Sequence, residues 1–151
     1  MNIKPTFRQA QRCDCALILD FIKGIARYEK LEDKVIATAE LLEEWIFDKQ
    51  SAWVIFPIVD GKEVGFAVFC QNFSTFMGRA GMYLEDIYIM PGYRGQGIGK
   101  ALFMHLVEIA ERRGYGRMEW QCLDWNTPSI EFYKKLGAEQ MSEWTTYRMH
   151  L

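Results

Sequence analysis

The sequence lacks a long apolar run and has little charge imbalance. No hydrophobic stretch approaches the roughly 20 residues that a membrane-spanning helix needs, and the first residues show no secretory hydrophobic region. The formal net charge is −2 over 151 residues, which gives no basic footprint for a nucleic acid. We therefore expect no membrane partner, no nucleic-acid partner and a cytoplasmic location.

Cysteine and histidine are also scarce. The chain has four cysteines (Cys13, Cys15, Cys70 and Cys122) and two histidines (His105 and His150). A disulfide framework is typical of short secreted domains, and a chain of this length does not need one. Cys13 and Cys15 are too close for a zinc site, no second pair follows, and the histidines have no partner at ligand spacing. We therefore expect no metal.

The rest of the composition is typical of a globular protein, and we expect one domain over residues 1–151. Hydrophobic periodicity and turn residues predict eleven elements. They are strand 3–8, helices beginning at Asp14 and Thr38, strands 52–59 and 64–73 joined at Asp60-Gly61, strand 81–89, helix 97–113, strand 118–123, helix 127–136, and a closing strand pair over 139–143 and 146–151. This order predicts an α/β fold with a mixed, mostly antiparallel central sheet flanked by helices.

The most informative segment runs from Tyr83 to Leu102, where a predicted strand is followed by a glycine-rich loop and a helix. A helix N-terminus offers unpaired N–H groups and a positive dipole end, which together bind phosphate. Two carboxylates, Glu85 and Asp86, lie on the strand just before the loop. This segment predicts an enzyme that uses a phosphorylated cofactor and a carboxylate base.

The loop spacing distinguishes between the known phosphate-binding patterns. It lacks the first glycine and the final hydroxyl residue of a Walker loop, and Lys100 occupies the third glycine position of the dinucleotide pattern. The pattern that fits is Arg-x-x-Gly-x-Gly, formed by Arg94, Gly97 and Gly99. It resembles the pyrophosphate loop of the GNAT superfamily, the acyl-CoA-dependent N-acetyltransferases.

Three separated segments extend the resemblance over nearly the whole chain, toward the diamine acetyltransferases that act on spermidine, spermine and thialysine. They are residues 27–31, residues 83–88 with the glycine loop, and residues 123–126 followed by 132–137. Ser74-Thr75 stands where polyamine-specific members have Asp-Pro, so the chain is more similar to the thialysine branch. The resemblance implies the GNAT fold with a splayed motif strand, acetyl-CoA as co-substrate, and a homodimer.

The resemblance also implies a set of cofactor-binding residues. The backbone of Ile87, Tyr88 and Ile89 would bind the pantetheine arm, while the glycine loop would hold the pyrophosphate. The remaining implied positions are Arg94, Gly95, Gln96, Gly97, Ile98, Gly99, Lys100, Asn126, Ser129 and Tyr133.

Acetyl transfer to an amine needs a neutral amine and a proton for the departing thiolate. A primary amine has a pKa near 10.4, so its deprotonation at pH 7 costs about 4–5 kcal/mol. We expect Glu85 to act as the base, directly or through water, and Asp86, on the opposite face by alternation, to be structural. Tyr133 matches the family's general acid.

The resemblance implies further residues for the amine itself. Tyr28 and Glu29 match the family's amine-binding pair at the end of the first helix, and Glu119 matches another substrate position; Glu85 would also bind the ammonium group. The function expected is acetyl transfer from acetyl-CoA to a small cationic primary amine, a polyamine, a diamine or a lysine-like amine such as thialysine, by direct attack. The alternatives are a protein N-terminus or lysine as substrate, and a non-catalytic CoA-binding sensor.

Overall fold

The computed structural model describes residues 2–151, which form two compact units. The first ends at Gln121 and contains the whole sheet, and the second runs from Cys122 to Leu151. In the described residues, no helix is both long and apolar enough to cross a membrane. The expectation of one domain over the whole chain stays a prediction.

The first unit is built on a mixed sheet in the strand order β1-β2-β4-β5-β6, with the short β3 paired to β2. The strands are β1 (Thr6–Gln9), β2 (Trp53–Val59), β3 (Lys62–Glu63), β4 (Gly65–Ser74), β5 (Arg79–Ile89) and β6 (Met118–Trp120). Every pair is antiparallel except β5 with β6. The predicted fold class is therefore confirmed.

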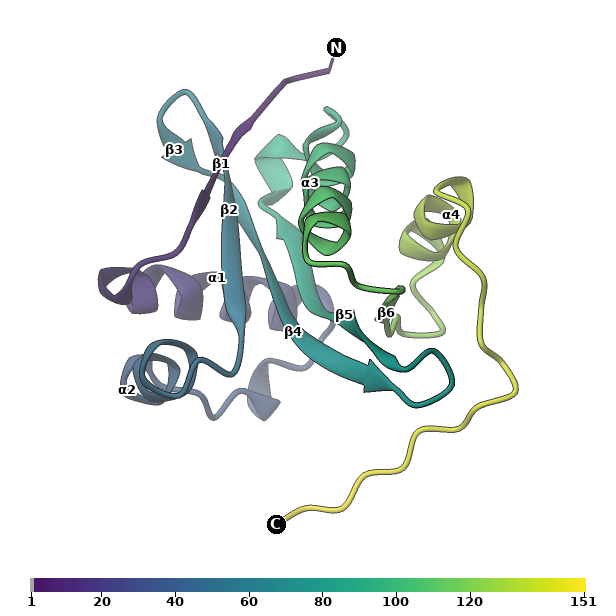
Figure 1. Cartoon of the computed structure of the whole chain (residues 1–151). Helices are drawn as coiled ribbons and strands as arrows, with labels where there is room; N and C mark the ends of the chain where they lie inside the picture. Colours follow the sequence, from purple (N-terminus) through teal and green to yellow (C-terminus); the bar gives the residue numbers. More distant parts are fainter. Residues whose placement is uncertain (1) are drawn as a thin grey trace. The chain divides into compact units, whose positions relative to one another are not determined.

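Helices cover both faces of this sheet (Figure 1). The helix α1 (Cys15–Tyr28) and the short α2 (Ala39–Leu42), which continues as a π-helical turn over Glu43–Asp48, lie on one face. There Phe21 packs against Phe56 and Phe66. The helix α3 (Ile98–Arg112) covers the opposite face with a buried apolar side that includes Leu102 and Leu106.

Local sequence signals explain where several elements begin and end. Thr38 caps α2, because its hydroxyl accepts a hydrogen bond from the Leu41 amide at 3.1 Å, as predicted. Asp60 and Gly61 have φ values of 50° and 76°, which suit a tight hairpin between β2 and β3. Gly114, with φ of 74°, follows α3 as the predicted C-terminal glycine.

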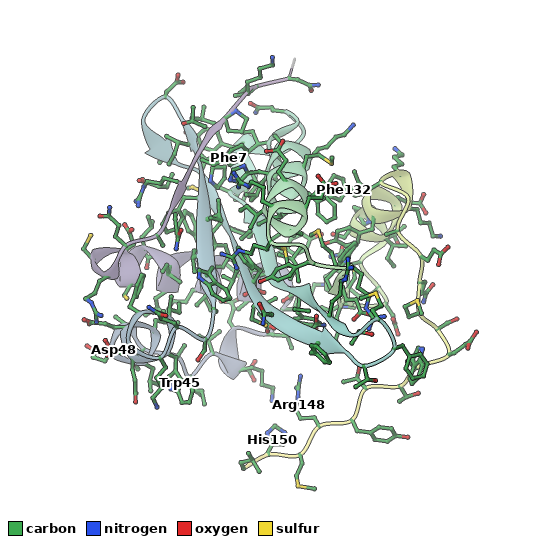
Figure 2. The ribbon with its side chains drawn as sticks, in the orientation of Figure 1. Phe7, Trp45, Asp48, Phe132, Arg148 and His150 are labelled. Carbon is green, nitrogen blue, oxygen red and sulfur yellow. The ribbon has the colours of Figure 1, made fainter. Side chains whose placement is uncertain are left out.

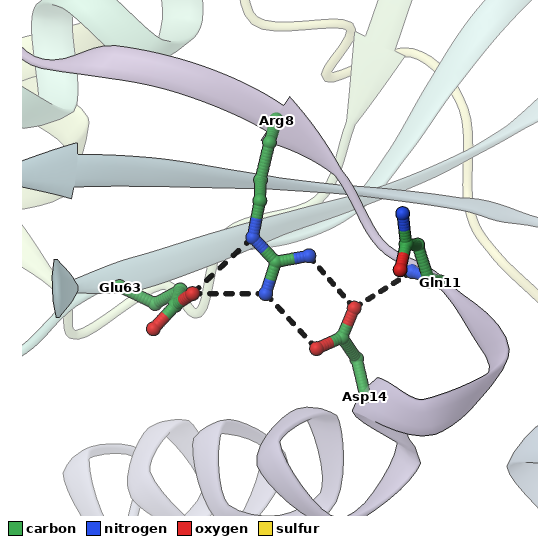
Figure 3. A network of polar contacts seen from close by, with 4 residues as sticks. All are labelled: Arg8, Gln11, Asp14 and Glu63. Atoms are coloured by element: carbon green, nitrogen blue, oxygen red, sulfur yellow. Dashed lines mark hydrogen bonds and ion pairs between the residues drawn. The ribbon is translucent and has the colours of Figure 1, made fainter. Parts of the chain in front are cut away.

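Asp14 precedes α1 as predicted but does not cap it through its side chain. Its carboxylate instead forms two bonds of 2.8 and 2.9 Å with the Arg8 guanidinium and accepts the Gln11 amide at 2.7 Å (Figure 3). Arg8 also donates to Glu63 at 2.9 and 3.2 Å. One guanidinium thus links β1 to the start of α1 and to β3, and it holds the pKa of Asp14 below its usual value.

The longest ladder in the sheet joins β4 to β5, from Gly65 opposite Ile89 to Ser74 opposite Arg79. Its register shifts once, because Val68 pairs with Asp86 while Phe69 pairs with Leu84. Glu85 is therefore an extra residue in a β-bulge. A bulge bends the strand and redirects side chains, and such features are common next to active sites.

The pairing of β5 with β6 is much shorter than its pairing with β4. It covers only Met82–Leu84 against Met118–Trp120, while β5 continues to Ile89. In the described chain, residues 85–89 therefore have no ladder partner on that edge. This is the splayed motif strand expected from the resemblance, and it leaves the edge of Ile87 and Ile89 open.

The second unit contains the helix α4 (Thr127–Lys135) and no strand among residues 122–151. The predicted strand pair over 139–143 and 146–151 is therefore wrong, and His150 does not lie on a strand. Likewise, β6 ends at Trp120 rather than at 123. The apolar residues of the last segment favour extended structure, but a strand forms only where a partner satisfies its backbone, and this unit provides none.

The start of β4 gives a test of how closely it packs on β5. A side chain at Gly65 would collide with the carbonyl oxygen of Tyr88 and with the Ile89 backbone, whereas a side chain at Gly92 would meet nothing within 4 Å. We expect Gly65→Ala to lower the free energy of unfolding by about 2 kcal/mol or more, because the two backbones must separate. Gly92→Ala is the matched control, and urea unfolding should show its stability unchanged or slightly raised. Equal midpoints for the two variants would contradict the close packing.

Candidate active site

The glycine loop between β5 and α3 has the geometry of an anion cradle. The loop begins with one turn of 3-10 helix, Pro91–Tyr93. Gly95 and Gly97 then take φ values of 74° and 83°, and Gly97 is the N-cap of α3. Residues with a Cβ atom rarely adopt these φ values, so the backbone conformation requires glycine at both positions. The loop leads directly into α3. The backbone N–H groups in the first turn of this helix have no carbonyl partner within the helix.

Gly99 needs a different explanation from its two neighbours. Its φ is not in the left-handed region, and a Cβ atom there would meet only Ile89, at an ordinary 3.7 Å. Nothing inside the chain therefore requires glycine at this first-turn position. A missing side chain does allow a ligand to approach the backbone closely, so this position fits the phosphate groups of a cofactor.

Arg94, the first residue of the motif, sends its side chain away from the loop. Its Nε atom donates to the Ile89 carbonyl at 2.7 Å, and its guanidinium lies 5.0 Å from the Tyr28 ring centroid and 5.3 Å from that of Tyr88. Gly24 leaves room for this arrangement, because a Cβ atom there would lie 2.6 Å from the Tyr88 hydroxyl. The glycine loop and Tyr28, predicted to bind the amine, are thus joined through one side chain.

Three carboxylates gather beside this loop. Glu85 and Asp86 lie at the bulge of β5, and Glu29 lies at the end of α1. Burial, together with the charges of Glu85 and Glu29, raises the pKa of Asp86 to about 7. Burial and the charge of Glu85 also raise the pKa of Glu29. The bulge interrupts simple alternation, and both β5 acids interact with Glu29.

The negative charge of Glu85 also acts on Cys70 and Tyr83, two side chains that could be mistaken for nucleophiles. Burial and the charge of Glu85 raise the pKa of Cys70 and of Tyr83. A thiol whose pKa is raised is a weaker source of thiolate, so Cys70 is unsuited to forming an acyl-enzyme. Negative charge dominates this side of β5, and a cation would relieve the repulsion.

Glu119 lies opposite Tyr83 in the β5–β6 register, and its substrate role stays a prediction. Its carboxylate already has protein partners, since Arg117 Nε lies at 3.3 Å and Asn72 donates at 3.4 Å. Both contacts are partly exposed. Glu119 therefore lies at the edge of the acidic cluster, with part of its charge compensated by Arg117.

The other predicted site residues belong to the second unit. The Asn126 side chain caps α4 by accepting a hydrogen bond from the Ser129 amide at 3.4 Å. Tyr133 lies on the same helix, with its ring 5.5 Å from that of Phe132. The structure thus brings together Tyr28, Glu29, Glu85 and the glycine loop, while the joining of Asn126, Ser129 and Tyr133 with them stays a prediction.

Asp86 is the residue whose importance the sequence understated. Alternation along a regular strand assigned it to a structural position, but the bulge and the end of α1 place it among like charges in a buried setting. The only signal in the sequence was its position beside Glu85 before the glycine loop. Perturbed pKa values of this kind cluster at functional sites.

Comparison with known proteins gives a consistent set of matches. The model of the Acetyltransferase (GNAT) family matches residues 18–138. A thialysine N-epsilon-acetyltransferase from Bos taurus is 35% identical over 153 aligned positions, covering 93% of this chain and 89% of that protein. An L-ornithine N5-acetyltransferase from Arabidopsis thaliana is 39% identical over 85 positions, covering 56% of this chain and 37% of the relative.

Solved structures show the same fold. An integron cassette protein from the mobile metagenome of V. cholerae superimposes with a TM-score of 0.80 at 26% identity, covering 99% of this chain and 94% of that one.

The raised pKa of Asp86 predicts how stability depends on pH. The folded chain keeps this proton up to about pH 7, whereas an unfolded aspartate loses it near 3.9, so stability falls as pH rises between these values. Asp86→Asn removes this loss. At about 1.4 kcal/mol per pKa unit, its free energy of unfolding relative to the wild type should rise by about 2–4 kcal/mol between pH 5 and 8.

Chemical denaturation across that pH range measures the effect. Asp60→Asn, in the exposed hairpin turn, is the control and should give a constant difference from the wild type. Parallel pH profiles for Asp86→Asn and the wild type would show that the Asp86 carboxyl is not perturbed.

Proposed function

This chain belongs to the GNAT family of acetyltransferases, and on that premise we propose that it transfers an acetyl group from acetyl-CoA to a primary amine of a small cationic substrate. The transfer is proposed to be direct, within a ternary complex. The observation that carries the proposal is the acidic cluster formed by Glu29, at the end of α1, with Glu85 and Asp86, on the strand that leads into the glycine loop. Substrate charge and cofactor phosphate thus have neighbouring sites.

The acidic cluster is suited to binding an ammonium group. Its members repel one another, and a bound cation would lower the raised pKa of Glu29 and of Asp86 by adding an attractive charge. Tyr28 adds an exposed aromatic ring next to Glu29, which favours cations through its π face. The Arg94 guanidinium already lies over the Tyr28 ring, 5.0 Å from its centroid. We therefore expect the substrate ammonium group to bind nearer to Glu29 and Glu85 than to this ring.

Proton removal from the ammonium is assigned to the β5 acids. Glu85 is exposed at the bulge and remains the proposed acceptor, directly or through water. Asp86 is a second candidate because a carboxyl with a pKa near 7 exists in both protonation states at neutral pH, which is the useful range for a general base.

Acetyl-CoA supplies the acetyl group as a thioester. Residues Gly95–Lys100 would hold its pyrophosphate with backbone amides, and Gly99 leaves room for that approach. Within residues 2–151, the edge of β5 at Ile87 and Ile89 has no ladder partner, and its backbone N–H groups would bind the pantetheine arm and the thioester oxygen, while the Ile89 carbonyl accepts a hydrogen bond from Arg94. In this role the side chains of these strand residues matter less than their backbone.

The second unit is proposed to complete the site. Tyr133 would give its phenolic proton to the departing thiolate, since a phenol with a pKa near 10 is an acid of suitable strength. Asn126 and Ser129 would contact the cofactor near the start of α4, where their own hydrogen bond fixes the first turn. No cysteine takes part in this scheme.

We propose a lysine-like primary amine as the substrate class, with thialysine as the first compound to test. Two relatives are named for their action on thialysine and on ornithine. Each of these amino acids carries a terminal amine on its side chain. Ser74-Thr75 also favours this branch over the long polyamines, because it removes an acidic residue. The homodimer implied by the resemblance and the cytoplasmic location expected from the sequence stay predictions.

An amine panel tests the proposed function. Thiol release from acetyl-CoA is measured with thialysine, lysine, ornithine, putrescine, spermidine, spermine and a peptide with a free N-terminus. We expect the lysine-like amines to give the highest kcat/KM, and Glu29→Gln to raise KM for them by about tenfold through loss of charge. Asp60→Asn, far from the cluster in sequence, is the control. A peptide preferred over all small amines would refute the substrate class, and CoA binding without turnover on any amine would favour a sensor.

Tyr133→Phe separates proton donation from cofactor binding. Removal of one hydroxyl leaves the ring on α4, so we expect kcat to fall about 100-fold or more while the affinity for CoA stays within a factor of two. Phe132→Tyr on the same helix serves as a control for changed ring polarity. Calorimetric CoA binding and steady-state kinetics measure the two quantities, and an unchanged kcat would exclude Tyr133 as the acid.

A further inference from the structure

A cavity of about 340 Å³ lies on the α3 face of the sheet, apart from the acidic cluster. It is bounded by β1, β2 and β4 and by the C-terminal half of α3, and all of these belong to the first unit. The helix α3 is 15 residues long, so its two ends are about 20 Å apart at 1.5 Å per residue. The cavity therefore flanks one end of α3 while the glycine loop forms the other.

Aromatic rings form the walls of this cavity. Phe7 of β1 stacks on His105 of α3, with ring centroids 4.3 Å apart and planes within 9°. Figure 2 shows Phe7 directed toward α3. Trp53 and Phe69 form a second stacked pair at 5.6 Å, and Ile55 lies buried between the strands. Flat walls of this kind favour a flat, aromatic ligand.

Two adjacent guanidinium groups, Arg112 and Arg113, line the same cavity. Arg113 lies over the rings of Trp53 and Phe69, at 4.5 and 5.3 Å, and donates to the Tyr115 hydroxyl at 3.1 Å. Among the described residues, no carboxylate forms an ion pair with Arg112 or Arg113. Most of their donor groups are thus available to a ligand.

Nearby negative charge is weaker than this pair of cations. The carbonyl end of α3 contributes about half a negative charge. Glu108 lies 4.0 Å from His105, at the helix surface. Burial lowers the pKa of His105, and Arg112 lowers it too, so this ring adds no full charge at neutral pH. The cavity therefore keeps a positive rim above apolar, aromatic walls.

We propose that this cavity is a second ligand site, which binds a small planar aromatic carboxylate. The ring would lie against the stacked walls, and the carboxylate would pair with Arg112 and Arg113, whose forked donors match its geometry. The cavity volume falls in the range of small-molecule sites. This site is separate from the proposed acetyl-transfer site, and none of its residues takes part in that reaction.

The test is a titration of the full chain followed through the indole N–H signal of Trp53 in an NMR spectrum. The probes are indole-3-acetate, phenyl phosphate, neutral 3-methylindole and acetate. We expect indole-3-acetate to shift the Trp53 signal with a Kd at least tenfold tighter than that of 3-methylindole, while acetate alone produces no saturable shift. Weaker binding of phenyl phosphate would support a carboxylate, whereas tighter binding of phenyl phosphate would overturn that assignment.

Variants identify the anion-binding groups. The double change Arg112→Gln with Arg113→Gln should weaken indole-3-acetate binding at least tenfold and leave 3-methylindole unaffected. Arg112→Gln alone keeps the stack of Arg113 on Trp53 and should give an intermediate loss, so the test does not depend on the stability of the double variant. Arg79→Gln, an exposed arginine of β5, is the control and should bind as the wild type does. Equal affinity for the acid and the neutral indole, or undiminished binding by the double variant, would overturn the proposal.

Discussion

The pairing of β4 with β5, with its one extra residue at Glu85, is the constraint on which the rest of the structure depends. This ladder extends over the whole of β4 and is held closely at one end, where Gly65 permits contact with the backbone of Tyr88. The bulge lets the strand bend as it leaves β6, and it directs two consecutive carboxylates toward Glu29. The open strand edge, the acidic cluster and the entry into the glycine loop all follow from that geometry.

The acidic cluster is unfavourable for the folded chain without a bound cation. Three carboxylates in a partly buried place are costly, because burial raises the pKa of Asp86 and of Glu29 and the repulsion between the carboxylates adds to it. A site that binds an ammonium ion gains affinity from the same arrangement, because the cation removes the repulsion. Strain of this kind, concentrated where a substrate would bind, is common at functional sites, and it explains why Asp86→Asn is expected to be more stable than the wild type at higher pH.

Much of the fold was predictable because its signals are local. The hairpin at Asp60-Gly61, the cap at Thr38 and the glycine after α3 each depend on the conformational preference of one or two residues. The closing strand pair was predicted from the same kind of pattern and was wrong, because a strand depends on a distant partner edge. Asp14 shows the same limit: its residue type predicted a helix cap, but Arg8, six residues earlier, captures its carboxylate.

The sequence by itself predicted a phosphate-binding loop, since Arg94, Gly97 and Gly99 are in the family spacing and glycine permits the left-handed backbone that Gly95 and Gly97 adopt. It also identified Glu85 as an acid just before that loop and, through the resemblance, Glu29 as an amine-binding residue. Only the tertiary structure decided that these acids interact with Asp86, that Arg94 turns toward Tyr28, and that two arginines share a cavity with four rings. Backbone conformation is set by the residue itself, whereas a pKa or a cavity is set by neighbours that only the folded chain brings together.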